Sequence, residues 1–197
     1  MVRQKHGQRL GSSRAGGYPG PMPDVRPLTG EPLPLDLLNT RWSEGGTEQD
    51  LLSTPDGVAA WLAGHGFAGP AGEPVAAALR EARAVMTELL DAPAAGTAAA
   101  FDRILDRGRL RRGYGPAGAV TRPETGDPAW LPAWTAAEAL LRLLETRPER
   151  VRRCAHDTCV LHFLDTTRNG TRRWCSMASC GNRSKSNRHY ARTRGGG

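Results

Sequence analysis

The chain lacks cysteine over its first 153 residues, and its four cysteines all fall within the last 44 of its 197 residues. It also lacks a run of 18 apolar residues, so we expect no membrane-spanning helix. The first 17 residues, MVRQKHGQRLGSSRAGG, are basic but have no apolar stretch of the kind found in signal peptides. These absences predict a cytoplasmic protein, associated with the nucleoid if it binds DNA, whose thiols stay reduced.

Several catalytic motifs are also absent. No Walker loop, H-E-x-x-H or G-x-S-x-G sequence occurs. His65 is the only histidine between residues 28 and 150, and no acid/base pair with suitable spacing accompanies it. We therefore expect that the protein is not an enzyme, and an enzyme with a supporting metal is the least favoured of three functional hypotheses.

Negative charge is scarce near the C-terminus. From Val151 onward, Asp157 and Asp165 stand against ten Lys and Arg residues, a net charge of +8, whereas residues 1–150 carry 17 basic and 18 acidic groups. A basic segment next to a slightly acidic one predicts a polyanionic partner for the basic segment alone. Double-stranded DNA is the leading candidate.

Glycine and proline are abundant, with 24 and 15 residues, so we expect substantial loops. Residues 1–27 are rich in Gly, Pro, Ser and Arg and have little apolar periodicity, which predicts a disordered basic leader. This leader is either a dispensable tail or an accessory phosphate-binding segment.

The four cysteines have matched spacing. Cys154 and Cys159 form one C-x4-C pair, fifteen residues follow, and Cys175 and Cys180 form the second. Four thiolates in this arrangement are typical of one structural Zn2+ in a closed tetrahedral shell, which leaves no position for a catalytic water. Two disulfides or a redox dithiol are the alternatives. His156, His162 and His189 are alternative ligands, although a surface or packing role is favoured for them.

The residues between the cysteine pairs predict local structure. Asn169-Gly170 separates two β-prone runs, residues 160–167 and 171–176, which is a strong hairpin signal. After Cys180, the sequence GNRSKSNRHYARTR can form a short basic helix. We expect a compact module in which this hairpin and helix are held by the metal, because so short a segment has little core of its own.

Basic side chains of this module are the candidate DNA contacts. Arginine suits bidentate binding to phosphate or guanine. The candidates lie at the expected hairpin tip and on the final helix: Arg168, Arg172, Arg173, Arg183, Lys185, Arg188 and Arg192. Asn182 could read adenine or cap backbone near the metal, and Trp174 could stack on a base or pack in the module; the second role is favoured for both.

The rest of the chain shows helical periodicity. We expect a helix from Thr54-Pro55 to about Phe67, with Thr as N-cap, and further helices over residues 73–92, 98–110 and 132–146. Residues 32–42 fit either a strand or a helical turn, and residues 113–128 fit a loop or a weak hairpin. The predicted fold class is mainly α: a small helical N-terminal domain followed by a compact zinc-stabilised β-hairpin/helix module.

A polar group within an apolar stretch marks a possible effector pocket. Asp36, Asn39 and Thr40 lie among leucines, and Trp42 and Trp61 are near in sequence. Polar groups in apolar walls are typical of ligand pockets. The favoured alternative is that these side chains bond to buried backbone.

Two parts of the chain resemble known families. The run FLDTTRNGTRRWCSMASCGNR resembles the CGNR zinc finger, whose name is spelled by Cys180, Gly181, Asn182 and Arg183. The segments LPLDLLNT and TPDGVAAWLAGHGF are similar to the ABATE domain that usually precedes that finger. The resemblance implies an ABATE-like helical domain over residues 28–148 and a CGNR-type finger over residues 149–194. It also implies a bacterial protein, with the four cysteines as zinc ligands.

These observations lead to three hypotheses. The first is a DNA-binding transcription regulator of the stress-induced kind, with an N-terminal domain that senses a small-molecule effector or forms a homodimer. The second is an adaptor that binds RNA or protein through the same zinc module. The third is the enzyme described above.

Overall fold

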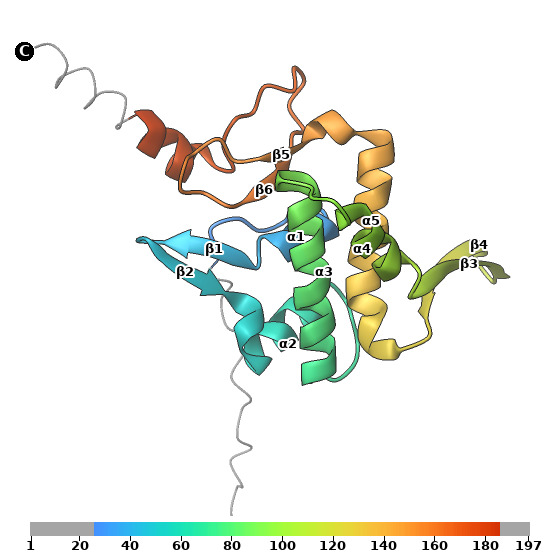
Figure 1. Cartoon of the computed structure of the whole chain (residues 1–197). Coiled ribbons are helices and arrows are strands. Elements are labelled where there is room, and N and C mark those ends of the chain that lie inside the picture. Colours follow the sequence, from blue (N-terminus) through green and yellow to red (C-terminus); the bar gives the residue numbers. More distant parts are fainter. Residues whose placement is uncertain (1–25, 186–197) are drawn as a thin grey trace, which may run out of the picture.

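The computed structural model describes residues 26–185 (Figure 1). The predicted leader, residues 1–27, therefore lies almost wholly outside the described residues. Arg188 and Arg192 also lie outside them. We refer to residues 26–148 as the helical body and to residues 150–185 as the cysteine module. No helix in the described part of the chain is both long and apolar enough to cross a membrane.

Helices form most of the regular structure, as predicted. The body contains α1 (Leu33–Leu38), β1 (Arg41–Glu44), β2 (Thr47–Asp50), a 3-10 turn (Leu51–Ser53), α2 (Pro55–Gly64), α3 (Glu73–Asp91), α4 (Thr97–Leu105), β3 (Gly108–Gly115), β4 (Gly118–Thr125), a second 3-10 turn (Pro128–Trp130) and α5 (Leu131–Thr146). A 3-10 turn (Pro148–Arg150) joins the body to the module, which contains β5 (Val151–Arg153), β6 (His162–Leu164) and a π-helical turn (Met177–Gly181).

The helices of the body surround a single apolar core. α3 packs against α1, α4 and α5, and its buried face includes Val75, Leu79, Ala82 and Met86, at the predicted spacing. The start of α2 was also predicted correctly, because the Thr54 hydroxyl accepts a hydrogen bond from the Gly57 N–H at 3.1 Å. For the ambiguous residues 32–42 the structure contains both alternatives in succession, α1 and then β1.

Three two-stranded antiparallel sheets accompany the helices. β1 pairs with β2 through a turn in which Gly45 and Gly46 have φ of 59° and 87°. These angles are those of a type I′ turn, which glycine adopts without strain. This hairpin was not predicted, although the Gly-Gly pair signals it.

The helix predicted over residues 98–110 is shorter than expected. α4 ends at Leu105, and Leu110 instead lies in β3 with 36% of its surface exposed. β3 pairs with β4 along its whole length, so the weak hairpin considered for residues 113–128 exists and begins earlier. Gly113, Gly115 and Gly118 have the spacing of a dinucleotide-binding loop, but they lie at a hairpin turn and not between a strand and a helix.

The hairpin predicted inside the cysteine module was wrong. β6 pairs with β5, so that Val151 faces Leu164 and Arg153 faces His162, and residues 171–176 form no strand. Gly170 does have a positive φ of 60°, and the chain turns there. The Asn-Gly signal thus located a turn correctly, but the partner of the β-prone run lies before it in the chain and not after it.

Candidate metal centre and basic face

The four cysteine sulfurs converge at one point in the module. They lie within 4.8 Å of one another, with Cys159 Sγ 3.8 Å from Cys175 Sγ and Cys175 Sγ 3.6 Å from Cys180 Sγ. A disulfide needs sulfurs about 2.05 Å apart. In a tetrahedron with metal–sulfur bonds of about 2.3 Å, the sulfurs lie about 3.8 Å apart. The spacing fits a metal shell and excludes disulfides in this conformation.

Backbone hydrogen bonds place each cysteine. The Cys154 N–H, at the end of β5, donates to the Leu161 carbonyl at 2.9 Å, and the Cys159 N–H donates to the His156 carbonyl at 2.9 Å. The Cys175 N–H points at the Cys154 sulfur, 3.4 Å away, as is usual for a ligating thiolate. Cys180 lies in the π-helical turn, and the Ser176 side chain caps the start of that turn.

Without a cation the thiols cannot all ionise. The hydrogen bond to Cys154 raises the pKa of Cys159 to about 12, and contacts with Cys154 and Cys159 raise the pKa of Cys175. Hydrogen bonds from those two neighbours lower the pKa of Cys154. One thiolate is therefore stabilised by neighbouring thiols, and a divalent ion is needed to hold four thiolates together. The residues present fit one structural zinc ion.

The loop between the sheet and the second cysteine pair is held by Asp165. Its carboxylate accepts hydrogen bonds from the Thr167 N–H, the Thr167 hydroxyl and the Arg172 N–H. These hydrogen bonds, the one from the Thr167 hydroxyl foremost, lower the pKa of Asp165. Sequence reasoning assigned no role to Asp165, although an Asp-x-Thr sequence is a common signal for such a turn.

Arg172 is internal to the module. Its guanidinium donates to the Trp174 carbonyl at 3.0 Å and to the Cys175 carbonyl, lies 4.2 Å from the centre of the Phe163 ring, and lies 3.6 Å from Glu31 of the body. It was predicted to contact DNA. Most N–H groups of the Arg172 guanidinium are engaged within the protein, around the backbone of the zinc ligand Cys175. The geometry therefore indicates that Arg172 supports the metal site.

The other predicted basic residues face outward where they are described. Arg168, Arg173, Arg183 and Lys185 are exposed. Arg183 and Lys185 follow directly on Cys180, in the helical residues that continue the π-helical turn. Trp174 packs against the cysteine cluster and donates to Ser184 at 3.1 Å, and the Asn182 side chain donates to the Ala178 carbonyl at 3.3 Å.

Polar side chains connect the body to the module. The Asn39 amide donates to the His162 carbonyl and accepts from the His162 N–H, both at 2.9 Å, so it acts like an additional strand residue beside β6. The Glu31 carboxylate accepts from the Leu164 N–H at 2.8 Å, and burial raises the pKa of Glu31. Asp91 of α3 contacts the His162 Nε2 at 2.8 Å. Burial lowers the pKa of His162.

The other two residues of the proposed pocket are also buried and bonded. The Asp36 carboxylate contacts Arg26 at 2.7 Å, the Trp61 indole at 3.0 Å and His65 at 3.3 Å. The Thr40 hydroxyl donates to the Leu37 carbonyl and accepts from Arg83, which also binds both oxygens of Asp50. Asp36, Asn39 and Thr40 thus all bond within the protein, and none of them lines the neighbouring cavity described below.

Comparison with known families agrees with this architecture. A family model described as "Putative stress-induced transcription regulator" and named ABATE matches residues 31–148, which is more than half of the chain. The chain belongs to the ABATE family. The CGNR zinc finger model matches residues 150–193, after the ABATE region, and includes all four cysteines. A comparison with curated proteins found no match. The family order and the thiol geometry together establish an ABATE domain followed by a CGNR finger with one structural zinc.

Proposed function

We propose that this ABATE protein is a DNA-binding transcription regulator whose cysteine module presents a basic face to duplex DNA. The observation that carries the proposal is the exposed positive charge of the module. Arg168, Arg173, Arg183 and Lys185 are exposed, and none forms an ion pair with another described residue. Of the two acids in the module, Asp165 is buried and only Asp157 is exposed. Such a surface attracts a polyanion and releases its counterions on binding.

The zinc site explains how this face is held in place. Arg183 and Lys185 lie within five residues of Cys180, so the metal fixes the helical turn from which they project. Arg168 lies in the loop that Asp165 and Arg150 hold from inside, because Arg150 donates to the Thr167 carbonyl at 2.6 Å. The cations therefore come from two rigid segments, which is the arrangement needed to follow a phosphate backbone.

The test is the salt dependence of binding to duplex DNA by the zinc-loaded full chain. The double variant Arg183→Gln/Lys185→Gln should weaken binding and reduce the slope of log K against log salt by about 2, with unchanged zinc content and melting temperature. Arg103→Gln/Arg142→Gln, which removes two exposed charges from α4 and α5, is the control and should leave the slope unchanged. Equal affinity of the module variant and the wild type would refute the proposal, and tighter binding to RNA would favour the adaptor hypothesis.

For the body we propose a sensing role, located at a cavity next to the module. This cavity of about 620 Å3 lies between one face of α3, the β1–β2 hairpin and the module. α3 contributes a row of polar side chains, from Arg80 to Asp91, while Leu38, Trp42 and Val160 give it apolar walls. A ligand there would touch both His162 of the module and Asp91 of the body, and so could change how the basic face is held.

Ala84 offers a test, since it is exposed on α3 and lines this cavity. Ala84→Trp should fill the space and abolish the rise in melting temperature given by any compound that stabilises the wild type in a panel of amino acids, nucleotides and organic acids. Ala77→Trp, exposed on α3 outside the cavity, is the control and should respond like the wild type. A compound that stabilises Ala84→Trp as well as the wild type binds elsewhere.

A further inference from the structure

The β3–β4 ribbon (residues 108–125) projects from the body, away from the cysteine module (Figure 1). Its eight cross-strand pairs run from Gly108 opposite Thr125 to Gly115 opposite Gly118. No residue of either strand is buried. A two-stranded sheet without a covering layer is marginally stable in water. Packing within the body therefore does not account for the length of this ribbon.

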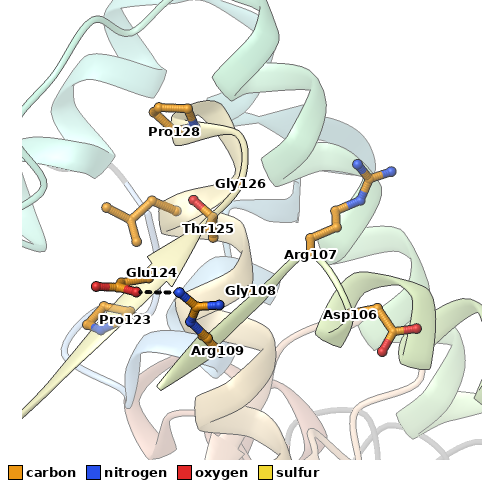
Figure 2. Close-up of a pocket in the computed structure, with 10 residues that line it drawn as sticks. Asp106, Arg107, Gly108, Arg109, Pro123, Glu124, Thr125, Gly126 and Pro128 are labelled. Atoms are coloured by element: carbon orange, nitrogen blue, oxygen red, sulfur yellow. Dashed lines mark hydrogen bonds and ion pairs between the residues drawn. The ribbon is translucent and has the colours of Figure 1, made fainter. Parts of the chain in front are cut away.

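Only the base of the ribbon is anchored. A side chain at Gly108 would lie 2.6 Å from the Trp134 ring, so the strand leaves α4 in direct contact with α5. Figure 2 shows Arg109 pointing across the strands to Glu124, and Arg109 and Arg111 each lie 3.2 Å from this carboxylate. These hydrogen bonds overcome the effect of burial and lower the pKa of Glu124. Charge is thus partly neutralised near the base.

Positive charge is left unneutralised in the middle of the ribbon, at the fourth and fifth of its eight cross-strand pairs. Arg112 and Arg122 are exposed, and the guanidinium group of neither forms a hydrogen bond or ion pair with another described residue. Arg122 faces Arg111 across the strands while Arg112 faces Thr121, so the two free guanidinium groups lie on opposite faces. Tyr114, one residue before the turn, is 87% exposed.

This chemistry selects among partners. β3 carries Arg109, Arg111 and Arg112 along its exposed edge, and charged edge residues of this kind oppose strand pairing with a second copy of the ribbon. A polyanion meets favourable charge on both faces. The major groove of DNA admits a two-stranded β-ribbon and places phosphates on either side of it, while an exposed tyrosine can stack or pack against nucleotides.

We infer that the β3–β4 ribbon is a second DNA-binding element that enters a groove and contacts phosphates through Arg112 and Arg122. The inference rests on the proposed function, because it assumes that the partner is DNA. Since the ribbon points away from the module, its contacts are separate from those of Arg183 and Lys185 (Figure 1). The ribbon would hold DNA flanking the segment that the module binds.

The experiment measures binding of the zinc-loaded full chain to a duplex several helical turns long, over a range of salt concentrations. Arg112→Gln/Arg122→Gln should lower the affinity by roughly tenfold and reduce the slope of log K against log salt by about 2. Both positions are exposed, so the fold and zinc content should not change. Arg142→Gln, exposed on α5, is the control and should bind like the wild type.

The outcomes separate the inference from the proposed function. If the module variant Arg183→Gln/Lys185→Gln weakens binding and the ribbon variant does not, the ribbon is not a DNA-binding element while the proposed function stands. If the wild type binds no duplex, both are wrong. If the ribbon variant weakens binding and Tyr114→Ala adds a further loss that Tyr114→Phe does not, the ribbon contacts nucleotides as inferred.

Discussion

The arginines of this chain divide into residues that hold the fold and residues that face solvent. Arg83 lies within the body and binds both oxygens of Asp50, at 2.7 and 2.6 Å, as well as the Thr40 hydroxyl. Arg172 is similarly engaged in the module. Composition alone cannot separate these classes, because a planar guanidinium suits a buried carboxylate as well as a phosphate.

Arg83→Met should destabilise the protein strongly. The change removes the Arg83 contacts of the Asp50 carboxylate and the Thr40 hydroxyl, and breaking this part-buried charged pair costs about 2 kcal/mol in the free energy of unfolding. Arg41→Met removes an exposed pair with Glu48, which solvent screens, and should leave the stability almost unchanged. Urea unfolding of both variants measures the difference in the free energy of unfolding. An equal loss in the two variants would show that the Arg83–Asp50 pair stabilises the fold no more than the exposed Arg41–Glu48 pair.

The same pair predicts a pH dependence. Burial acts to raise the pKa of Asp50, but the hydrogen bonds and charge of Arg83 outweigh it, and the net pKa lies below the ordinary 3.8. A lowered carboxyl pKa gives stability that is present above the ordinary pKa and is lost as pH falls through the folded-state pKa. The difference in stability between the wild type and Arg83→Met should therefore be largest near neutral pH and shrink below pH 3.8. A constant difference down to acid pH would contradict this assignment.

At the scale of elements, glycine positions determine where helices can pack. Gly57, in the first turn of α2, lies directly against the preceding 3-10 turn. A Cβ there would come within 1.9 Å of the Leu51 carbonyl oxygen, which is backbone and cannot rotate away. Gly64, near the end of the same helix, has no neighbouring atom within 4 Å of such a Cβ.

These two glycines make a matched pair of variants. Gly57→Ala should lower the free energy of unfolding by about 3 kcal/mol, because the turn must move to admit the methyl group. Gly64→Ala should be neutral or stabilise the protein by up to about 1 kcal/mol, through helix propensity. Thermal melting measures both, and a harmless Gly57→Ala would show that the turn before α2 is easily displaced.

Local signals in the sequence predicted elements well, and long-range pairing was the main source of error. The Thr54 cap, the apolar face of α3 and the cysteine spacing depend on residues close in the chain, and all three are found in the structure. The partner of β6 could not be chosen in this way. A β-prone run pairs with whichever strand the tertiary fold brings to it, and β5 lies beside it because both pack on the body.

The role of Asn39 shows the same limit for single residues. Its place among leucines suggested either a pocket or a backbone contact, and the backbone it bonds to is 123 residues away. No local pattern identifies such a partner. Arg83 was missed because its partners Thr40 and Asp50 are also distant in sequence, and a charged residue in a helix is most often exposed. Asp165 was missed although its partners are local, because the Asp-x-Thr turn signal was not used.

At the scale of the whole molecule, the body and the module share their cores. Trp42 of β1 is buried in the apolar cluster that contains the cysteines, and Leu164 of β6 is buried in the core of the helical body. Small zinc modules often depend on metal for folding. Here the module also uses apolar surface supplied by the body, so we expect the two parts to be coupled in stability.

Zinc removal tests this coupling. Chelation should leave most of the helical signal in circular dichroism, because the body core includes only Val151 and Leu164 from the module. Tryptophan fluorescence should change, since Trp42 and Trp174 lie against the cysteines. Rebinding should release protons and weaken as pH falls, because thiols such as Cys159 must lose protons to bind metal. Complete loss of helix on chelation would show that the body cannot fold without the metal.

The Asn39 contact tests the coupling without touching the metal. Asn39→Ala leaves the backbone N–H and carbonyl of His162 without a partner and should cost about 2 kcal/mol. It should also speed amide exchange in β6 while zinc content stays the same. Asn169→Ala, an exposed change in the module, is the control. Unchanged exchange in β6 would mean that Asn39 does not hold the module to the body.

Sequencing of the DNA that the protein selects would show whether its zinc-fixed basic module binds specific sites. The zinc-loaded full chain would be mixed with fragmented genomic DNA of its source at physiological salt, and the retained fragments sequenced. We predict a few strongly enriched sites, and loss of that enrichment in Arg183→Gln/Lys185→Gln. Uniform recovery, or none, from the wild type would contradict a sequence-specific regulator and make RNA or protein the partner to test next.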